Sequence, residues 1–92
     1  MWYLYITKNQ NGAFYTGITT NPNMRLKDHK RGKGGKYTKR NRPEKILYTE
    51  RFPSRVQAEA RERQIKRWSR AKKIALVNGD LNELRHLSIS RD

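Results

Sequence analysis

The first residues of the chain constrain its fold most strongly, because they alternate between two kinds of side chain. In residues 2–6, "WYLYI", the even positions are Trp, Leu and Ile, whereas the odd positions are Tyr3 and Tyr5. This period of two is typical of a strand with one apolar face. We therefore predict that the chain opens with a strand that carries its tyrosines on one side.

A tight turn is predicted directly after this strand. Asn11-Gly12 lies in the polar stretch "KNQNG", and both residues tolerate the positive φ of a hairpin turn. Residues 13–18 should then return antiparallel to the first strand. The hairpin places Tyr15 near the strand that carries Tyr5.

Signals for a helix follow the hairpin. Asn21 is a suitable N-cap, Pro22 suits the first helical position, and Gly32 is a typical stop. Within this helix Arg25 and His29 are four residues apart, so we expect them one turn apart on one face.

The second half of the chain predicts one strand and two helices. Residues 44–52 have the pattern of a third strand, and Ser54 with Gln57 fits the capping box of a helix over residues 54–68. A further helix over residues 70–77, capped by Ser69 and ending at Asn78-Gly79, is expected next.

These elements predict the fold class and the domain boundaries. The order strand, strand, helix, strand, helix, helix is typical of a small α+β domain, in which helices cover a three-stranded antiparallel sheet. We expect a single domain over residues 1–80. Residues 81–92 form a C-terminal extension that we expect to be partly helical, with a short turn, or frayed.

The charge balance limits the partners of the chain. Lys and Arg number 22 and Asp and Glu number 8, which gives a net charge of +14 over 92 residues. Such a balance favours a polyanion, and we expect nucleic acid, with DNA favoured over RNA. The sequence contains no apolar stretch near the roughly 18 to 20 residues that span a bilayer, and its start lacks the basic region of a signal peptide. We therefore expect a cytoplasmic protein without a membrane partner.

Residues 30–42 are predicted to form a basic loop. The segment has no apolar periodicity and contains three glycines. Its cations could follow a phosphate backbone while its aromatic ring stacks on a base, although such charge runs are often only solvated. The candidate nucleic-acid-binding residues are Lys30, Arg31, Lys33, Lys36, Tyr37, Lys39, Arg40 and Arg42.

Several of these residues together resemble a known family. The triplets Tyr3-Leu4-Tyr5 and Tyr15-Thr16-Gly17, then Arg25 and His29 and a later Glu62, are similar to the ordered motifs of GIY-YIG nucleases. The stretches "YTGITT" and "GKGGKYTKRNRP" resemble the small single-domain bacterial members, and the resemblance covers about residues 2–80. Tyr3 stands where the family name has glycine, and Thr16 stands where it has isoleucine.

The resemblance implies a phosphodiesterase site in which Tyr5, Tyr15, Arg25 and His29 are catalytic. Phosphodiester hydrolysis needs an activated water and neutralisation of phosphoryl charge. A tyrosine, with an ordinary pKa near 10, can be the base only beside positive charge or a metal, and Arg25 provides such charge. The resemblance favours Tyr15 as the base, with Tyr5 positioning water or phosphate, and the residues alone leave both open.

Glu62 is the candidate metal ligand. It falls on the helix face of Ala58 and Ile65, which we expect to be packed, whereas Glu59 points away. With no cysteine and two histidines in the chain, a metal needs oxygen ligands, and Mg²⁺ or Mn²⁺ held by one carboxylate, water and phosphate fits. The resemblance assigns the same role to Glu62. Asn78 is a candidate for a supporting position behind this ligand.

Two functional classes follow from these residues. The first is a divalent-metal-dependent endonuclease that cleaves DNA with little sequence preference, in repair or recombination. The alternative is a non-catalytic nucleic-acid-binding module on the same fold. Singly, each residue also has a structural interpretation: Tyr3 and Tyr5 as the exposed strand face, or Glu62 as an ion-pair partner of Lys66.

Both classes predict that binding is mainly electrostatic. The affinity for duplex DNA, measured between low and moderate salt, should fall by about 0.9 log unit per log unit of salt for each phosphate neutralised. An affinity that does not change with salt would contradict both functions.

Overall fold

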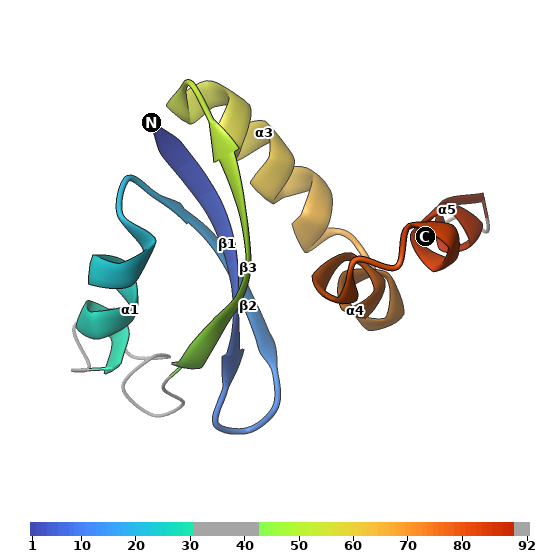
Figure 1. The fold of residues 1–92 in the computed structure, drawn as a ribbon, viewed down its shortest axis with the longest axis horizontal. Coiled ribbons are helices and arrows are strands. Elements are labelled where there is room, and N and C mark those ends of the chain that lie inside the picture. Colours follow the sequence, from blue (N-terminus) through green and yellow to red (C-terminus); the bar gives the residue numbers. More distant parts are fainter. Residues whose placement is uncertain (31–42, 90–92) are drawn as a thin grey trace.

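The computed structural model describes residues 1–30 and 43–89. The described elements follow in chain order: β1 (Trp2–Asn9), β2 (Phe14–Thr19), α1 (Pro22–Lys30), β3 (Pro43–Phe52), α3 (Arg55–Lys66), α4 (Arg70–Asn78) and α5 (Leu81–Ile89). They form the predicted α+β fold, a three-stranded antiparallel sheet with helices on both faces (Figure 1).

The first strand of the predicted hairpin forms the centre of the sheet. The strand order is β2-β1-β3, so β1 is hydrogen-bonded along both of its edges. Tyr5 pairs with Gly17 on β2 and with Thr49 on β3. The turn closes where Gly12 adopts a φ of 86°, as expected for a glycine in a tight turn.

The alternation of β1 gives the sheet two different faces, and helices cover each of them. Leu4 and Ile6 are both fully buried and pack with Ile65 of α3 and Leu76 of α4. The helices α3, α4 and α5 lie on this side of the sheet, whereas α1 lies on the other (Figure 1). The odd positions of β1 therefore face α1.

Side-chain caps start the helices where the sequence predicts. Asn21 Oδ1 accepts a hydrogen bond from the backbone N–H of Met24 at 3.1 Å, and Ser54 Oγ accepts one from the N–H of Gln57 at 3.3 Å. Ser69 caps α4 in the same manner. These bonds satisfy N–H groups that have no partner inside the helix.

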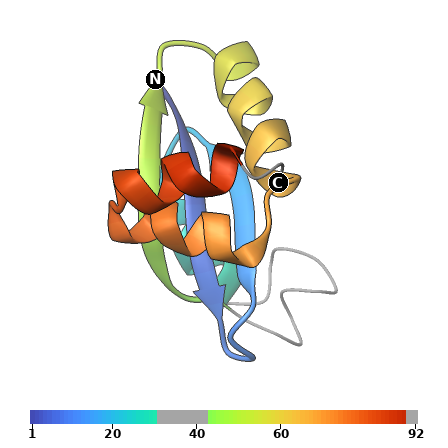
Figure 2. The same ribbon diagram turned by 90° about the vertical axis from the view of Figure 1, so that its right-hand side faces the viewer.

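The end of α4 fixes the direction of the last helix. Gly79 ends α4 with a left-handed φ of 70°, and α5 then packs beside α4 across the strands (Figure 2). The extension over residues 81–92, which the sequence predicts to be partly helical or frayed, carries α5 at Leu81–Ile89. Within the described segments, no helix has the length and hydropathy needed to cross a membrane.

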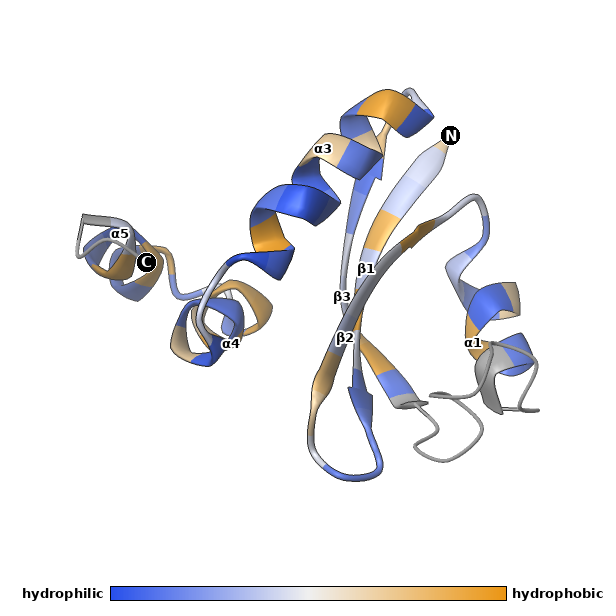
Figure 3. Cartoon of the chain, turned by 180° about the vertical axis from the view of Figure 1, so that it is seen from behind, coloured by the Kyte–Doolittle hydropathy of each residue, from blue (hydrophilic) through white to orange (hydrophobic). Residues whose placement is uncertain are grey.

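Charged side chains hold α3 against β3 at one side of the core. Arg61 Nε lies 3.0 Å from Glu50 Oε1, and Tyr48 donates a hydrogen bond to the same carboxylate. Burial and this hydrogen bond raise the pKa of Tyr48 to about 12. Most of the α3 ribbon is hydrophilic, with short hydrophobic segments (Figure 3), so polar contacts position this helix together with its narrow apolar stripe.

Candidate functional site

Two tyrosines and an arginine meet on the α1 face of the sheet. Tyr5 lies on β1 and is only 2% exposed, and Tyr15 lies on the neighbouring strand with its ring centroid 6.1 Å from that of Tyr5. The Tyr5 side chain is hydrogen-bonded to the side chains of Tyr15 and Arg25. The structure thus brings Tyr5, Tyr15 and Arg25 into one cluster, which we call the tyrosine cluster.

Gly17 leaves the space that the Tyr5 side chain occupies. A Cβ atom at position 17 would lie 2.6 Å from the Tyr5 hydroxyl oxygen and 2.8 Å from Cζ of the same ring. The same atom would lie 3.1 Å from Tyr15 Cε1. Both distances to Tyr5 are shorter than real Cβ contacts, so the Tyr5 ring can occupy this position only because residue 17 has no side chain.

The protonation of Tyr5 is set by its surroundings. Burial raises the pKa of Tyr5 from 10.0 to about 12, and the neighbouring Tyr15 adds to the increase, while the Arg25 guanidinium opposes it. At neutral pH the Tyr5 hydroxyl therefore keeps its proton and can act as a hydrogen-bond donor.

The sheet is hollowed beside the tyrosine cluster. The hollow has a volume of about 510 Å³ and lies between the start of α1 and strands β1 and β3. It lies next to the cluster, because Tyr3 precedes Tyr5 on the same face and Thr49 is the cross-strand partner of Tyr5. The lining residues are Tyr3, Thr20, Asn21, Pro22, Asn23, Ile46 and Thr49.

Glu62 lies on α3 and therefore on the other side of the sheet from α1. Ala58 and Ile65, which flank it along the helix, are both fully buried. The Glu62 side chain is 21% exposed and lies 3.5 Å from Lys66 Nζ. Glu59 is 35% exposed and is paired with Arg55. Glu62 is thus more buried than Glu59, as the helical wheel predicts. Its pairing with Lys66 also agrees with a purely structural role for this carboxylate.

The helical wheel also shows toward which strand Glu62 leans. With about 100° per residue, Arg61 and Glu62 lie on opposite flanks of the buried Ala58–Ile65 stripe. Arg61 reaches Glu50 on β3, so Glu62 leans toward the opposite edge of the sheet, which is β2. Glu62 and Tyr15 therefore approach β2 from its two faces.

The remaining candidate residues are located by the elements that carry them. His29 lies in α1, one helical turn after Arg25. Asn78 is the last residue of α4 and is exposed. Lys30 is the last residue of α1. The other candidates of the basic loop lie outside the described residues: Arg31, Lys33, Lys36, Tyr37, Lys39, Arg40 and Arg42.

Comparison with known proteins connects this arrangement to a family. The model of the GIY-YIG catalytic domain matches residues 1–75, which include both tyrosine triplets, Arg25 and Glu62. The chain belongs to the GIY-YIG family. This match confirms the resemblance that the motifs indicated. The family is of nuclease type.

Relatives of similar size share most of this GIY-YIG chain. The UPF0213 protein SH2523 of Staphylococcus haemolyticus is 44% identical over 75 residues, which is 82% of this chain and 92% of that protein. The solution structure of the UPF0213 protein BH0048 from Bacillus halodurans is 42% identical, with a TM-score of 0.54, and the match covers 85% of this chain and 84% of that one. The protein EF2693 from E. faecalis is 36% identical with a TM-score of 0.57, and the match covers 84% of this chain and 82% of that one.

GIY-YIG nucleases generally use a divalent metal, and such an ion needs oxygen ligands from the protein. Across residues 1–30 and 43–89, no group of three or more His, Cys, Asp or Glu side chains is placed to hold a metal. Mg²⁺ in phosphate-processing sites is commonly held by one or two carboxylates, water and substrate phosphates. Glu62 supplies one such carboxylate, and its partly exposed pair with Lys66 is weak enough to open.

The sequence identifies Gly17 only as the last residue of the Tyr15-Thr16-Gly17 motif and assigns it no role in the site. Its role depends on the cross-strand pairing with Tyr5, which follows from the register of the hairpin. A signal was present, because a glycine inside a strand commonly marks a close approach of another group.

Replacing Gly17 with Ala should destabilise the fold through this contact. The new Cβ must displace the buried Tyr5 ring or bend β2, so we expect the free energy of unfolding in urea to fall by about 1 to 3 kcal/mol. In a Tyr5→Leu background, where the hydroxyl and ring are absent, the same Gly17→Ala change should have less than half this effect. An equal reduction in both backgrounds would place the strain elsewhere.

The raised pKa of Tyr5 predicts a pH dependence of stability. Because the folded-state pKa of about 12 lies above the ordinary value of 10.0, the stabilisation is complete below pH 10 and is lost as the pH rises through 12. The difference in unfolding free energy between the parent and Tyr5→Phe should fall by about 1 kcal/mol from pH 9 to pH 11. Tyr3→Phe is the control, and a similar fall in that variant would refute the assignment to Tyr5.

Proposed function

We propose that the chain is a divalent-metal-dependent endonuclease that hydrolyses phosphodiester bonds of DNA in the cytoplasm, with little intrinsic sequence preference. The observation that carries the proposal is the tyrosine cluster, in which Tyr5, Tyr15 and Arg25 meet on one face of the sheet. A role in repair or recombination is the corresponding physiological expectation.

The three side chains of the cluster suit different parts of the reaction. Arg25 is exposed, and its planar guanidinium can hold two oxygens of a phosphate and neutralise charge as the phosphoryl group is attacked. Tyr5 keeps its proton because of its pKa of about 12, so it donates a hydrogen bond that fixes Tyr15 or the substrate. Tyr15 is less buried, and we assign it the role of accepting a proton from water.

Two further residues complete the proposed site. His29, one turn after Arg25, would hydrogen-bond a tyrosine or carry its proton. Glu62 would hold Mg²⁺ or Mn²⁺ at the β2 edge with water and a substrate phosphate, and Asn78 would have a supporting position. The metal would supply charge neutralisation for the transferring phosphoryl group.

One observation favours the alternative of a non-catalytic binding module. The Glu62 carboxylate has an ion-pair partner on its own helix, Lys66, at 3.5 Å. If this pair persists when nucleic acid binds, the tyrosine cluster would hold a phosphate through Arg25 without cleaving its ester bond.

Nicking of supercoiled plasmid separates the two functions and tests the metal ligand. We expect the parent to nick plasmid with Mg²⁺ or Mn²⁺ and to stop in EDTA. Glu62→Gln keeps the size of the side chain but removes its charge, so nicking should fall roughly 100-fold while DNA binding is retained or slightly strengthened. Arg25→Ala should weaken both turnover and binding.

Glu59→Gln is the matched control, because Glu59 is on the same helix and is paired with Arg55 at the surface. This variant should nick at the parental rate. Full activity in Glu62→Gln together with reduced activity in Glu59→Gln would mean that the metal ligand lies on a different turn of the helix. Absence of nicking by the parent with either metal would favour the binding module.

A further inference from the structure

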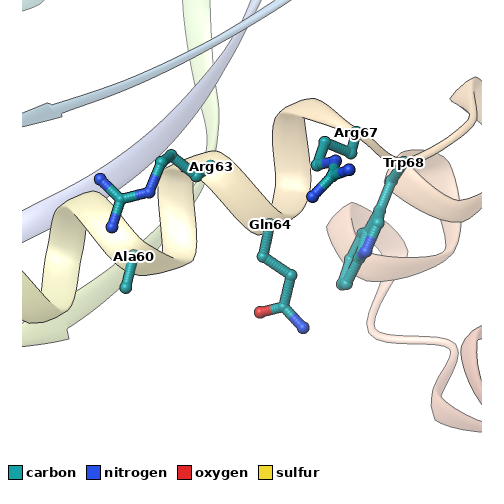
Figure 4. Close-up of a pocket in the computed structure, with 5 residues that line it drawn as sticks. All are labelled: Ala60, Arg63, Gln64, Arg67 and Trp68. Atoms are coloured by element: carbon teal, nitrogen blue, oxygen red, sulfur yellow. The ribbon is translucent and has the colours of Figure 1, made fainter.

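A groove lies on the outer side of α3, where the helix connects to α4. Figure 4 shows the residues that line it. Its volume is about 670 Å³. Four of its residues lie in α3 or at its C-cap, and the fifth lies in the connection to α4. The lining residues are Ala60, Arg63, Gln64, Arg67 and Trp68.

The groove opens away from the sheet. Ala58 and Ile65 mark the side of α3 that is buried against the strands. At about 100° per residue, Arg63 and Arg67 lie roughly 140° to 180° around the helix from Ala58. The groove is therefore separated from the tyrosine cluster by both α3 and the sheet, and it is not part of the candidate site.

The groove is positively charged and its cations are available. The Arg63 side chain is 69% exposed, and its contact with Glu59 is long, at 4.0 Å. Arg67 is exposed, and among the described residues it has no ion pair. Among the described residues, neither guanidinium group has a close carboxylate that a phosphate would have to displace.

The indole of Trp68 serves as a wall of this groove. The Arg61 guanidinium carbon lies 5.1 Å from its ring centroid, and Lys72 Nζ lies 4.3 Å from the same ring. Lys72 is only 6% exposed, so a buried positive charge is held against the ring. Cations already use the ring face, which disfavours base stacking and favours contacts with phosphate.

We propose that this groove is a second nucleic-acid surface, which binds the sugar-phosphate backbone of DNA through Arg63 and Arg67 on the side opposite the tyrosine cluster. Two guanidinium forks suit phosphate oxygens, and the net charge of +14 favours the same partner. The proposal rests on DNA being the partner in the proposed function but does not require cleavage.

The test compares two double variants with the same change in charge. Binding of a fluorescent duplex is measured in EDTA over a range of salt concentrations for the parent, Arg63→Gln/Arg67→Gln and Lys8→Gln/Arg85→Gln. Lys8 and Arg85 are exposed and lie outside the groove. Affinity falls with salt, so the slope of log affinity against log salt is negative. The groove variant should make this slope less steep by about 0.9 for each phosphate that is no longer neutralised, hence by about 1.8 in total. The control should change it by less than half as much.

A second measurement locates the bound DNA directly. In the NMR spectrum of Trp2→Phe the remaining indole N–H signal belongs to Trp68. We expect this signal to shift when duplex is added to Trp2→Phe, and to stay in place when the same background also carries Arg63→Gln/Arg67→Gln. Equal salt slopes in the two double variants, or a Trp68 signal that does not respond to saturating duplex, would overturn the proposal. Both measurements are made without metal and therefore do not depend on cleavage. Absence of nicking in the plasmid assay would contradict the proposed function but would not affect the outcome of this test.

Discussion

The structure depends on the position of β1 at the centre of the sheet, where both of its edges are hydrogen-bonded. A strand held on both sides cannot rotate or slip, so each side chain is committed to one face. Leu4 and Ile6 are directed into the core with α3 and α4, and Tyr5 is directed toward α1. The apolar core and the tyrosine cluster are therefore consequences of one alternating segment. A shift in the register of β1 would disrupt both of them.

The cluster is built by close approach rather than by a deep cavity. Tyr5 is almost completely buried although its hydroxyl is polar, and this is tolerated because the hydroxyl has hydrogen-bond partners in Tyr15 and Arg25. The missing side chain of Gly17 provides the space. Burial then keeps Tyr5 protonated, so the environment separates the roles of two chemically identical side chains: a buried donor and a more accessible candidate base.

The elements that were predictable are those specified by local chemistry. The caps Asn21, Ser54 and Ser69 each accept a hydrogen bond from the backbone of their own helix, and such signals are visible over three or four residues. The side of the sheet on which α3 packs was not predictable, because it depends on contacts between elements distant in the chain. The position of Glu62 relative to Tyr15 depends on that packing. The sequence could therefore propose Glu62 as a metal ligand but could not predict where it lies relative to the tyrosine cluster.

The alternation of β1 also limits how the length of this domain can vary. Removal or addition of one residue inside the strand would exchange its two faces, placing tyrosine hydroxyls among Ile65 and Leu76 and apolar side chains beside Arg25. Such a change would remove the core and the cluster in a single step. Between the two tyrosine motifs, insertions and deletions are therefore expected in the turn around Gly12, where the chain leaves the sheet, and the distance between the motifs varies with the length of that turn.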